Sequence, residues 1–338
     1  MEKNIRVSVM VTFYNQKQYI EECLTSILKQ DIGAPFEIIC GDDGSTDGTY
    51  EILLEWHRRY PEKITVYRMP RKHDEKYEPI ERVSHNRINM LKHAKGKYIA
   101  FLDGDDYYLD DSKLSKQVEI LEKNESISAC GHPVKMIWDN KEQSDVVIGR
   151  ISNEKIKIKR DIYWAFIWLH ADSFLYRNIF FENPELIDKI DTHFFDDNLI
   201  TCYFLLYGDV MYLPDCMVAY RQFVGSSWNS RSELEKAYVN MRVYGASKHV
   251  LKNKNIICFV RCIEAWETLY KYRKSDIKID DGMSDILKIP FVQKTVNYKN
   301  YSLIDKFLYQ VIYFIPIHSK IIIKILNKLK RVSYRVCR

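Results

Sequence analysis

The sequence lacks the signatures of several common protein classes. Neither of the glycine-rich phosphate loops, GxGxxG or GxxxxGK[ST], occurs in it, which argues against a dinucleotide-dependent dehydrogenase and a P-loop kinase. The eight cysteines include no CxxC pair and are scattered through apolar runs, so we expect reduced core thiols and a cytoplasmic protein. No internal repeat stands out, and strand periodicity beginning near Arg6 leaves no room for a signal peptide.

A strong excess of charge is also missing. The 51 basic and 46 acidic side chains leave a formal net charge of +5, which is too small to indicate a nucleic-acid binder over the whole chain. The 338 residues exceed one average domain, and 46% of them are apolar. Length and composition therefore suit one large core with an appended region.

What the chain does contain is a repeated pattern of apolar runs that end in polar clusters. The predicted strands cover residues 7–11, 36–40 and 98–102, and helical spacing follows the first two over 20–28 and 49–60. Strand, polar loop, helix and strand in this order indicate a parallel sheet, whose ligands bind beyond the carboxyl ends of the strands. All three polar clusters lie at such ends.

The cluster after the third strand carries the most chemistry. Asp103, Asp105 and Asp106 follow the apolar run directly, and acids packed so tightly repel one another unless a cation such as Mg²⁺ or Mn²⁺ neutralises them. We therefore predict a metal-diphosphate site, with Asp105 and Asp106 as the metal ligands. A solvated acidic turn is the alternative. An EF-hand loop is excluded, because Tyr107 and Tyr108 occupy positions that need an oxygen ligand and a glycine.

Taken together, three motifs resemble glycosyltransferase family 2, whose enzymes have the GT-A fold. The motifs are residues 9–15, 42–47 and 94–106. The resemblance is strong over about the first 110 residues and weaker to about residue 230. It implies an α/β, Rossmann-like fold with a mostly parallel central sheet flanked by helices. The expected organisation is a nucleotide-sugar-binding half over 1–110, an acceptor-binding half over 111–230, and a helical C-terminal region over 231–338.

The resemblance also assigns residues to the donor. Thr12 and Tyr14 would line the nucleotide pocket, with Tyr14 near the base. Asp43 would accept a hydrogen bond from the uracil ring, and a carboxylate suits the imide N–H because it is an acceptor-only partner. Asp103 would bind the nucleotide sugar or only orient the acidic cluster that it opens, while Asp105 and Asp106 would serve the ribose and the metal-bound diphosphate.

One segment departs from the family pattern. Residues 85–90 stand where many relatives carry an Ala-Arg-Asn helix start, and the preceding 71–82 are highly charged with little periodicity. The charged stretch is either a solvated connection or a mobile loop that brings Arg82 or Arg87 to the diphosphate. We take Arg87 as a candidate nucleotide-sugar-binding residue.

Inversion of the anomeric centre requires a general base to remove the proton from the acceptor hydroxyl. In relatives this is the second acid of a pair near a helix start, and the matching pair here is Asp196 and Asp197. We predict Asp197 as the base. Asp196 would raise its pKa by like-charge repulsion or orient the acceptor. Alternatively, the two acids serve only as a helix cap and a favourable charge in the first turn.

Two further side chains fit this plan less specifically. His170 lies in a segment, 168–177, that resembles the acceptor floor of relatives, and it is either catalytic or a structural histidine. Arg221, in 218–223, either approaches the donor diphosphate or forms a surface ion pair. The Gln-x-x-Arg-Trp motif of processive relatives is absent, which favours transfer of one sugar per encounter.

Beyond about residue 232 the pattern becomes helical, and the tail from about 303 to 338 is apolar and basic. A helix over 319–338 would place six basic side chains opposite six aliphatic ones. The tail has no apolar stretch near 18 residues, so it does not predict a membrane span. We expect either an amphipathic helix on an anionic membrane surface or a helix packed against the domain.

The sequence thus predicts an inverting glycosyltransferase that depends on Mn²⁺ or Mg²⁺. It would move a sugar from a nucleotide-sugar donor, expected to be UDP-linked, to a saccharide or lipid-linked glycan in cell-surface polysaccharide synthesis. The expected location is the cytoplasm or the inner face of the cell membrane. One alternative is a nucleotidyltransferase, although residues 12–16 offer no basic phosphate loop. Another is a catalytically silent sugar-nucleotide-binding or membrane scaffold protein. Such a protein would be expected to lose its acids, but those at positions 43, 105, 106 and 197 are all present.

Overall fold

The described part of the chain falls into two compact units. The computed structural model describes residues 5–72, 79–138, 146–190, 195, 197–222, 230–232, 236 and 250. The first unit takes its residues from 1–160 and 168–223, and the second from 161–167 and the positions after 223. The expected boundary near residue 230 stays a prediction.

A central sheet of eight described strands organises the first unit, in the order β3-β2-β1-β4-β10-β6-β11-β9. Four neighbouring strands, β3 to β4 in this order, are parallel, and β6 and β11 are parallel to each other. Only β10 and β9 pair antiparallel to their neighbours in this sheet. The strands are β1 (Val7–Phe13), β2 (Phe36–Asp42), β3 (Ile64–Arg68), β4 (Tyr98–Asp103), β6 (Ile127–Gly131), β9 (Ile156–Ile158), β10 (Leu175–Arg177) and β11 (Asp209–Tyr212). The predicted mostly parallel sheet is confirmed.

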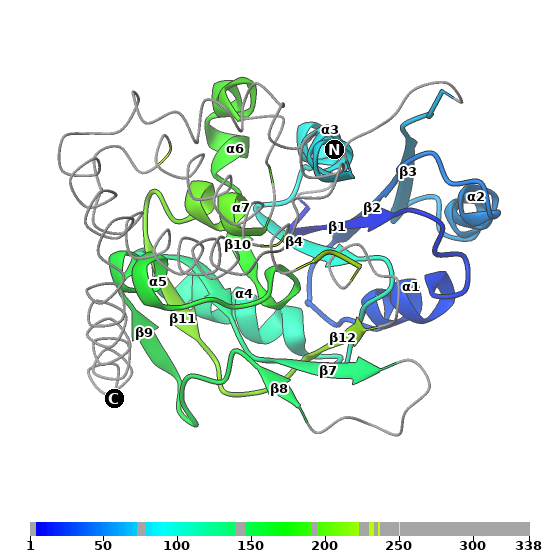
Figure 1. Cartoon of the computed structure of the whole chain (residues 1–338). Helices are drawn as coiled ribbons and strands as arrows, with labels where there is room; N and C mark the ends of the chain where they lie inside the picture. The colour runs from blue at the N-terminus through cyan, green and yellow to red at the C-terminus, as the bar shows by residue number, and fades with distance from the viewer. Residues whose placement is uncertain are drawn as a thin grey trace, which may run out of the picture. The chain divides into compact units, whose positions relative to one another are not determined.

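Helices cover both faces of the parallel strands, which explains their continuous apolar runs. Alternate residues of β1, such as Val9 and Val11, share one core cluster with Ile20 and Leu24 of helix α1. Met10 is also fully buried, although it is not part of that cluster. Figure 1 shows β1 and β2 lying between α3 above and α1 below. The helices of this part are α1 (Ile20–Leu28), α2 (Thr49–Arg59), α3 (Pro79–His93) and α4 (Lys113–Lys123).

A smaller sheet and several short elements complete the described fold. Four described strands pair in the order β5-β12-β7-β8. They are β5 (Tyr107–Tyr108), β7 (Val134–Trp138), β8 (Val147–Ile148) and β12 (Val218–Gln222). The remaining elements are α5 (Arg160–Phe166), η1 (Ala171–Ser173), α6 (Ile179–Glu182), η2 (Pro184–Lys189) and α7 (Asp197–Phe204).

The structure corrects one expectation about the charged segment 71–82. Helix α3 begins at Pro79, so Arg82 lies within a helix rather than on a loop. Proline is well suited to the first turn of a helix, because its φ angle is already helical and its missing N–H would have had no partner there. Arg87 lies on the same helix, and its side chain is buried. Neither arginine is carried by a mobile connection.

Two further expectations can be compared with the described residues. Cys23, Cys40, Cys130, Cys202 and Cys216 are all free, and the first four are buried, which agrees with reduced core thiols. Within the described ranges, no helix has both the length and the apolarity needed to cross a bilayer. The expected amphipathic helix over 319–338 lies outside the described residues.

Gly96, at the entrance to β4, offers a test of how tightly the sheet is built. A Cβ at this position would lie 2.4 Å from the backbone nitrogen of Ser8, so the strands would have to shift. We expect Gly96→Ala to lower the free energy of unfolding by about 1–3 kcal/mol, the usual cost of overpacking. Urea denaturation would measure the loss. Gly33→Asn is the control, because a side chain at Gly33 would meet open space. Asparagine is chosen because it tolerates the φ of +65° at this position. An unchanged stability of Gly96→Ala would contradict the close approach.

Candidate active site

Three polar clusters meet at one edge of the central sheet. The registers Thr12↔Asp103 and Phe13↔Asp42 bring the ends of β1, β2 and β4 side by side. The hydroxyl of Thr12 donates a hydrogen bond to Asp103 Oδ1 at 2.8 Å. The backbone N–H of Asp43 donates to the Phe13 carbonyl at 2.9 Å. The parallel sheet therefore gathers the motif residues as the sequence predicted.

The loop after β4 is pressed against β1, which accounts for Gly104. A Cβ on this residue would lie 2.2 Å from Cδ1 of Phe13. The Gly104 N–H donates to the Thr12 carbonyl at 2.9 Å. Only a residue without a side chain fits there without displacing the Phe13 ring, so the loop presents its acids on either side of a glycine.

Asp43 is a buried carboxylate held by two arginines. Arg82 Nε donates to Asp43 Oδ1 at 2.6 Å, and a terminal nitrogen of Arg71 contacts Oδ2. Arg71 also donates from Nε to the Asp43 carbonyl at 2.8 Å. The Arg71 guanidinium carbon lies 3.9 Å from the ring centroid of Tyr14, whose side chain is 44% exposed. An exposed aromatic ring, a carboxylate and two guanidinium groups thus form one cluster.

A third arginine links two other carboxylates. Arg87 donates from one terminal nitrogen to Asp197 Oδ1 at 2.9 Å and from the other to Asp103 Oδ1 at 3.3 Å. The Arg87 side chain is 5% exposed, while those of Asp103 and Asp197 are 36% and 31% exposed. Arg87 therefore connects Asp197, the predicted base, to Asp103 at the end of β4. Asp196 lies outside the described residues.

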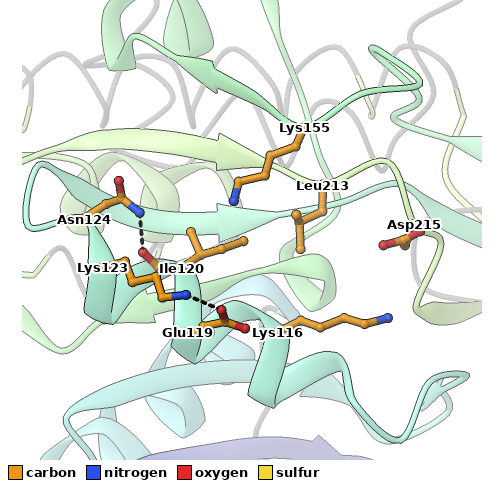
Figure 2. Close-up of a pocket in the computed structure, with 8 residues that line it drawn as sticks. All are labelled: Lys116, Glu119, Ile120, Lys123, Asn124, Lys155, Leu213 and Asp215. Atoms are coloured by element: carbon orange, nitrogen blue, oxygen red, sulfur yellow. Dashed lines mark hydrogen bonds and ion pairs between the residues drawn. The ribbon is translucent and has the colours of Figure 1, made fainter.

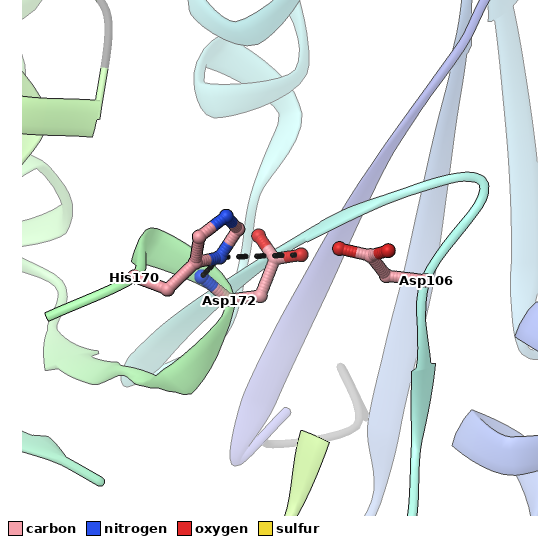
Figure 3. Close-up of side chains that lie close together, drawn as sticks. All are labelled: Asp106, His170 and Asp172. Atoms are coloured by element: carbon pink, nitrogen blue, oxygen red, sulfur yellow. Dashed lines mark hydrogen bonds and ion pairs between the residues drawn. The ribbon is translucent and has the colours of Figure 1, made fainter. Parts of the chain in front are cut away.

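Asp106, Asp172 and His170 form a buried group at the same edge. One ligand atom from each lies within 4.8 Å of the others, and Figure 3 shows the two carboxylates pointing toward each other with His170 beside Asp172. His170 Nδ1 lies 3.8 Å from Asp172 Oδ2. That same oxygen accepts the backbone N–H of Asp103 at 3.3 Å.

Burial and mutual repulsion shift the acids of this region toward their protonated forms. Burial, with the neighbouring Asp103 charge, raises the pKa of Asp105 to about 7. The same two causes raise the pKa of Asp172 to about 6. Burial and the charge of Asp172 raise the pKa of Asp106 well above its usual value. Facing carboxylates of this kind need either a proton or a cation between them.

These residues fit a divalent cation. Asp106 Oδ2 and Asp172 Oδ1 are buried and accept no hydrogen bond from the described residues, so two acceptor oxygens are left for a ligand. Two carboxylates suit a divalent cation such as Mg²⁺ or Mn²⁺, and the imidazole offers one further ligand atom. Of the two predicted metal ligands, Asp106 belongs to this group and Asp105 does not. The assignment of both as ligands stays a prediction.

Two antiparallel strands explain why these partners lie together. β10 pairs antiparallel with β4, so the segment before β10 lies where β4 ends, and that segment contains His170 and Asp172. The sequence analysis considered His170 but missed Asp172. The available signal was the His-Ala-Asp spacing just before a short strand, but it points to the acidic cluster only once the strand pairing is known.

The second antiparallel pairing places Arg221. β12 pairs with β5, and the Arg221 backbone N–H donates to Asp106 Oδ1 at 2.7 Å. Its side chain donates to the Asp105 carbonyl at 2.9 Å and to Glu22 at 2.5 Å. Arg221 therefore holds the acidic loop in place, and its predicted contact with a diphosphate stays a prediction.

Lys113 is a buried cation that the sequence did not single out. Its side chain is fully buried, and its ammonium nitrogen lies 4.5 Å from the ring centroid of Tyr108. The ammonium donates to Gln117 Oε1 at 3.1 Å. Burial lowers the pKa of Lys113 to about 7, against the opposing influence of Asp172. The region behind the acids therefore contains a positive group whose charge is partly suppressed.

A pocket on α4 shares no residue with these clusters. Figure 2 shows Lys116, Lys123 and Lys155 around it, with Ile120 and Leu213 between them. Lys116 pairs with Asp110 at 2.6 Å, and Lys123 pairs with Glu119 at 2.5 Å. Two of its three lysines are thus neutralised, and we assign it no role in the chemistry.

Comparison with known proteins agrees with this arrangement. The profile of glycosyl transferase family 2 matches residues 8–183. The chain is similar to the uncharacterized protein Rv1520 of Mycobacterium tuberculosis, with 28% identity over 246 residues, 71% of this chain and 65% of that protein. It is 30% identical over 162 residues to the poly(ribitol-phosphate) beta-glucosyltransferase of Bacillus spizizenii, which covers 44% of this chain and 23% of the relative. The chain thus spans less than two thirds of the length of these relatives.

Solved structures show the same fold. Residues 1–349 of Staphylococcus aureus TarS, in complex with UDP-GlcNAc, superpose with a TM-score of 0.54 at 22% identity, covering 87% of this chain and 79% of that one. The mannosyltransferase PcManGT of Pyrobaculum calidifontis, in complex with GDP-Man and Mn²⁺, gives a TM-score of 0.50 at 17% identity, covering 98% and 86%. The expected GT-A fold is confirmed.

The raised pKa values generate a prediction about cation binding. Metal ions bind the deprotonated ligands, so protons compete for Asp105 and Asp172, whose pKa values are about 7 and about 6. We expect Mn²⁺ affinity to fall as the pH drops from about 7.5 to about 5.5, by about tenfold per pH unit for each displaced proton. Calorimetric titration with MnCl₂ would measure this.

Asp172→Asn tests the same site by removing one of its carboxylates. Its matched control is Asp110→Asn, since Lys116 and Ser112 lower the pKa of Asp110 to about 2. The control should keep the Mn²⁺ affinity of the unmutated protein, whereas Asp172→Asn should weaken it. Equal affinity at both ends of the pH range would contradict the site.

Proposed function

Because this chain belongs to glycosyl transferase family 2, we propose that it is an inverting, metal-dependent glycosyltransferase that uses a UDP-sugar donor. The acceptor would be a saccharide or lipid-linked saccharide in cell-surface polysaccharide synthesis. The observation that carries the proposal is the meeting of Asp43, Asp103, Asp106 and Asp197 at one sheet edge, each with a defined partner. Several polar groups along one edge suit a nucleotide-sugar donor, which consists of a nucleobase, two sugars and a diphosphate.

The cluster around Asp43 supports a uracil base. The Watson–Crick edge of uracil presents an acceptor, a donor and an acceptor. Asp43 lies between the guanidinium groups of Arg71 and Arg82, and each guanidinium has five N–H donors. The Asp43 carboxylate is an acceptor-only group, so it would accept the imide N–H of uracil. Tyr14 supplies an exposed ring on which a base can stack.

The diphosphate would bind beside the acids that follow β4. Asp106, His170 and Asp172 would hold a divalent cation, with Asp105 as a further ligand from the same loop. When bound, that cation would stabilise the negative charge that grows on the leaving nucleoside diphosphate. The Mn²⁺ in the PcManGT complex supports a divalent cation in this role. Thr12 would line the nucleotide pocket at the end of β1, where its hydroxyl bonds Asp103.

Asp197 would act as the general base for single displacement. It begins α7, and the Arg87 guanidinium holds its Oδ1. About a third of its side chain is exposed, so an acceptor hydroxyl could reach it. The acceptor's hydroxyl oxygen would attack the anomeric carbon while the hydroxyl proton passes to the Asp197 carboxylate. The bond from the anomeric carbon to the diphosphate oxygen would break in the same step, and UDP would leave with the bonding electrons. We keep the proposal that Asp196 orients the acceptor.

The acceptor class is supported by relatives. One similar protein is named a poly(ribitol-phosphate) beta-glucosyltransferase and another a putative teichuronic acid biosynthesis glycosyltransferase, TuaG, of Bacillus subtilis. Both names describe sugar transfer onto anionic cell-wall polymers. Lipid-linked acceptors are at a membrane surface, and the basic and apolar pattern of 319–338 supports a peripheral position on the inner face of the cell membrane.

The first test concerns the donor base. With Mn²⁺ present, calorimetry should show tighter binding of UDP than of GDP. Asp43→Asn should weaken UDP binding by about 10- to 100-fold, because hydrogen bonds to charged groups contribute about 1.5–3 kcal/mol. Glu119→Gln is the control, since Glu119 pairs with Lys123 on the surface and belongs to none of the clusters at the sheet edge. Tighter binding of GDP than of UDP would refute uracil as the nucleobase of the donor.

The second test concerns the base catalyst. Asp197→Asn keeps the shape of the side chain but removes its basicity, so turnover should fall by roughly 10²- to 10⁴-fold. UDP affinity should change little, because the proposed role of Asp197 is to accept a proton from the acceptor hydroxyl and not to bind the donor. Release of UDP from a panel of UDP-hexoses and UDP-N-acetylhexosamines would measure turnover. Activity within a few-fold of the unmutated enzyme would make Asp197 a helix-terminal charge and nothing more.

A further inference from the structure

We propose that Arg87 is a positioning residue: it fixes the orientation of the general base Asp197 and ties it to the donor-side carboxylate Asp103. This inference rests on the proposed function, since it assigns Arg87 a role in the same reaction. It differs from the sequence expectation, in which Arg87 binds the nucleotide sugar directly.

The geometry joins two halves of the fold through one side chain. Arg87 lies on α3, Asp103 ends β4, and Asp197 begins α7. Both terminal nitrogens of the guanidinium are used: one lies 2.9 Å from Asp197 Oδ1 and the other 3.3 Å from Asp103 Oδ1. Asp103 Oδ1 also accepts the Thr12 hydroxyl at 2.8 Å. A continuous set of hydrogen bonds therefore runs from the end of β1 to the start of α7.

Burial makes this arrangement selective for arginine. The Arg87 side chain is 5% exposed, and a buried charge is tolerated only when it is paired and hydrogen-bonded. A guanidinium is planar and can bond two carboxylates with different nitrogens, whereas a lysine ammonium is a compact charge on a flexible stem. The two carboxylates would otherwise repel each other across the site.

The carboxylates are buried on one side and open on the other. Arg87 holds Oδ1 of Asp197 from the protein side, while the side chain remains 31% exposed. With Oδ1 committed to the arginine, Oδ2 is the oxygen that receives the proton from the acceptor hydroxyl. Near-attack geometry is sensitive to displacements of about 1 Å, which can cost about 10²-fold in rate. Arg87 thus acts on turnover through Asp197.

Helix α3 connects this arginine to the nucleoside end of the site. Arg82, on the same helix, bonds Asp43, and Asn86 donates to the Gly41 carbonyl at 2.8 Å. A Cβ on Gly41 would lie 2.2 Å from the Asn86 side chain, so helix and strand are in close contact. Helix α3 therefore positions both Arg82, which bonds Asp43, and Arg87, which bonds Asp197.

The test is a double-mutant cycle between Arg87→Lys and Asp197→Asn, with two readouts for each protein. Turnover is measured as UDP release from the panel of UDP-sugars, and binding as calorimetric affinity for UDP with Mn²⁺. We expect Arg87→Lys to lower kcat by about 10- to 100-fold and to leave UDP affinity within about threefold. In the Asp197→Asn background, Arg87→Lys should lower kcat by less than about threefold. The reason is that each of the two substitutions removes the same Arg87–Asp197 interaction. Arg6→Lys is the matched control, since Arg6 pairs with Glu122 outside the site.

Each other outcome overturns a stated claim. Weaker UDP binding with unchanged kcat would make Arg87 a donor-binding residue, and additive costs in the cycle would show that it does not act through Asp197. If Arg87→Lys fails to fold, Arg87→Gln is used in the same cycle, and failure of both to fold would make the role purely structural. An unmutated enzyme that releases UDP from no donor would instead refute the proposed function, and this inference with it.

Discussion

Repulsion among carboxylates at one edge of the sheet is the constraint to which the rest of the site is fitted. Parallel pairing brings the ends of β2 and β4 to the two sides of β1. Asp43 follows β2, Asp103 ends β4, and the loop after β4 adds Asp105 and Asp106. Each acid requires a nearby positive charge, a hydrogen-bond donor or a proton. Arg71 and Arg82 serve Asp43, and Arg87 serves Asp103. The remaining buried pair, Asp106 and Asp172, is the place left for a metal.

This arrangement prepares the site before substrates arrive. Guanidinium groups and backbone N–H donors already hold the carboxylates, so they need not reorganise when charge develops during reaction. The cost is paid in stability, because Lys113 and several acids are buried with shifted pKa values. Functional sites commonly depart from the rules that stabilise a core. The aromatic cluster around Phe101, with Tyr176, Phe195 and Phe204 packed against it, lies in the same unit and offsets part of that cost.

Antiparallel pairings bring later segments of the chain to the acids at the edge of the parallel sheet. β10 runs antiparallel to β4 and delivers His170 and Asp172 to the acids. β12 pairs with β5 and delivers Arg221 to the same loop. Helix α7 supplies Asp197 from the second half of the domain. The proposed donor motifs therefore follow early strands, and the groups proposed to complete the reaction come from later elements.

The sequence by itself determined the parallel sheet, because apolar runs followed by polar loops and helical spacing are local patterns. For the same reason it placed Thr12, Asp43 and Asp103 at one edge. The tertiary structure alone decided that Asp172 faces Asp106, that Arg87 joins Asp103 to Asp197, and that Arg82 lies on a helix beginning at Pro79. These contacts join residues far apart in the chain, and strand pairing and helix packing set them. A sequence pattern records which side chain follows a strand, but not which distant side chain will neutralise it.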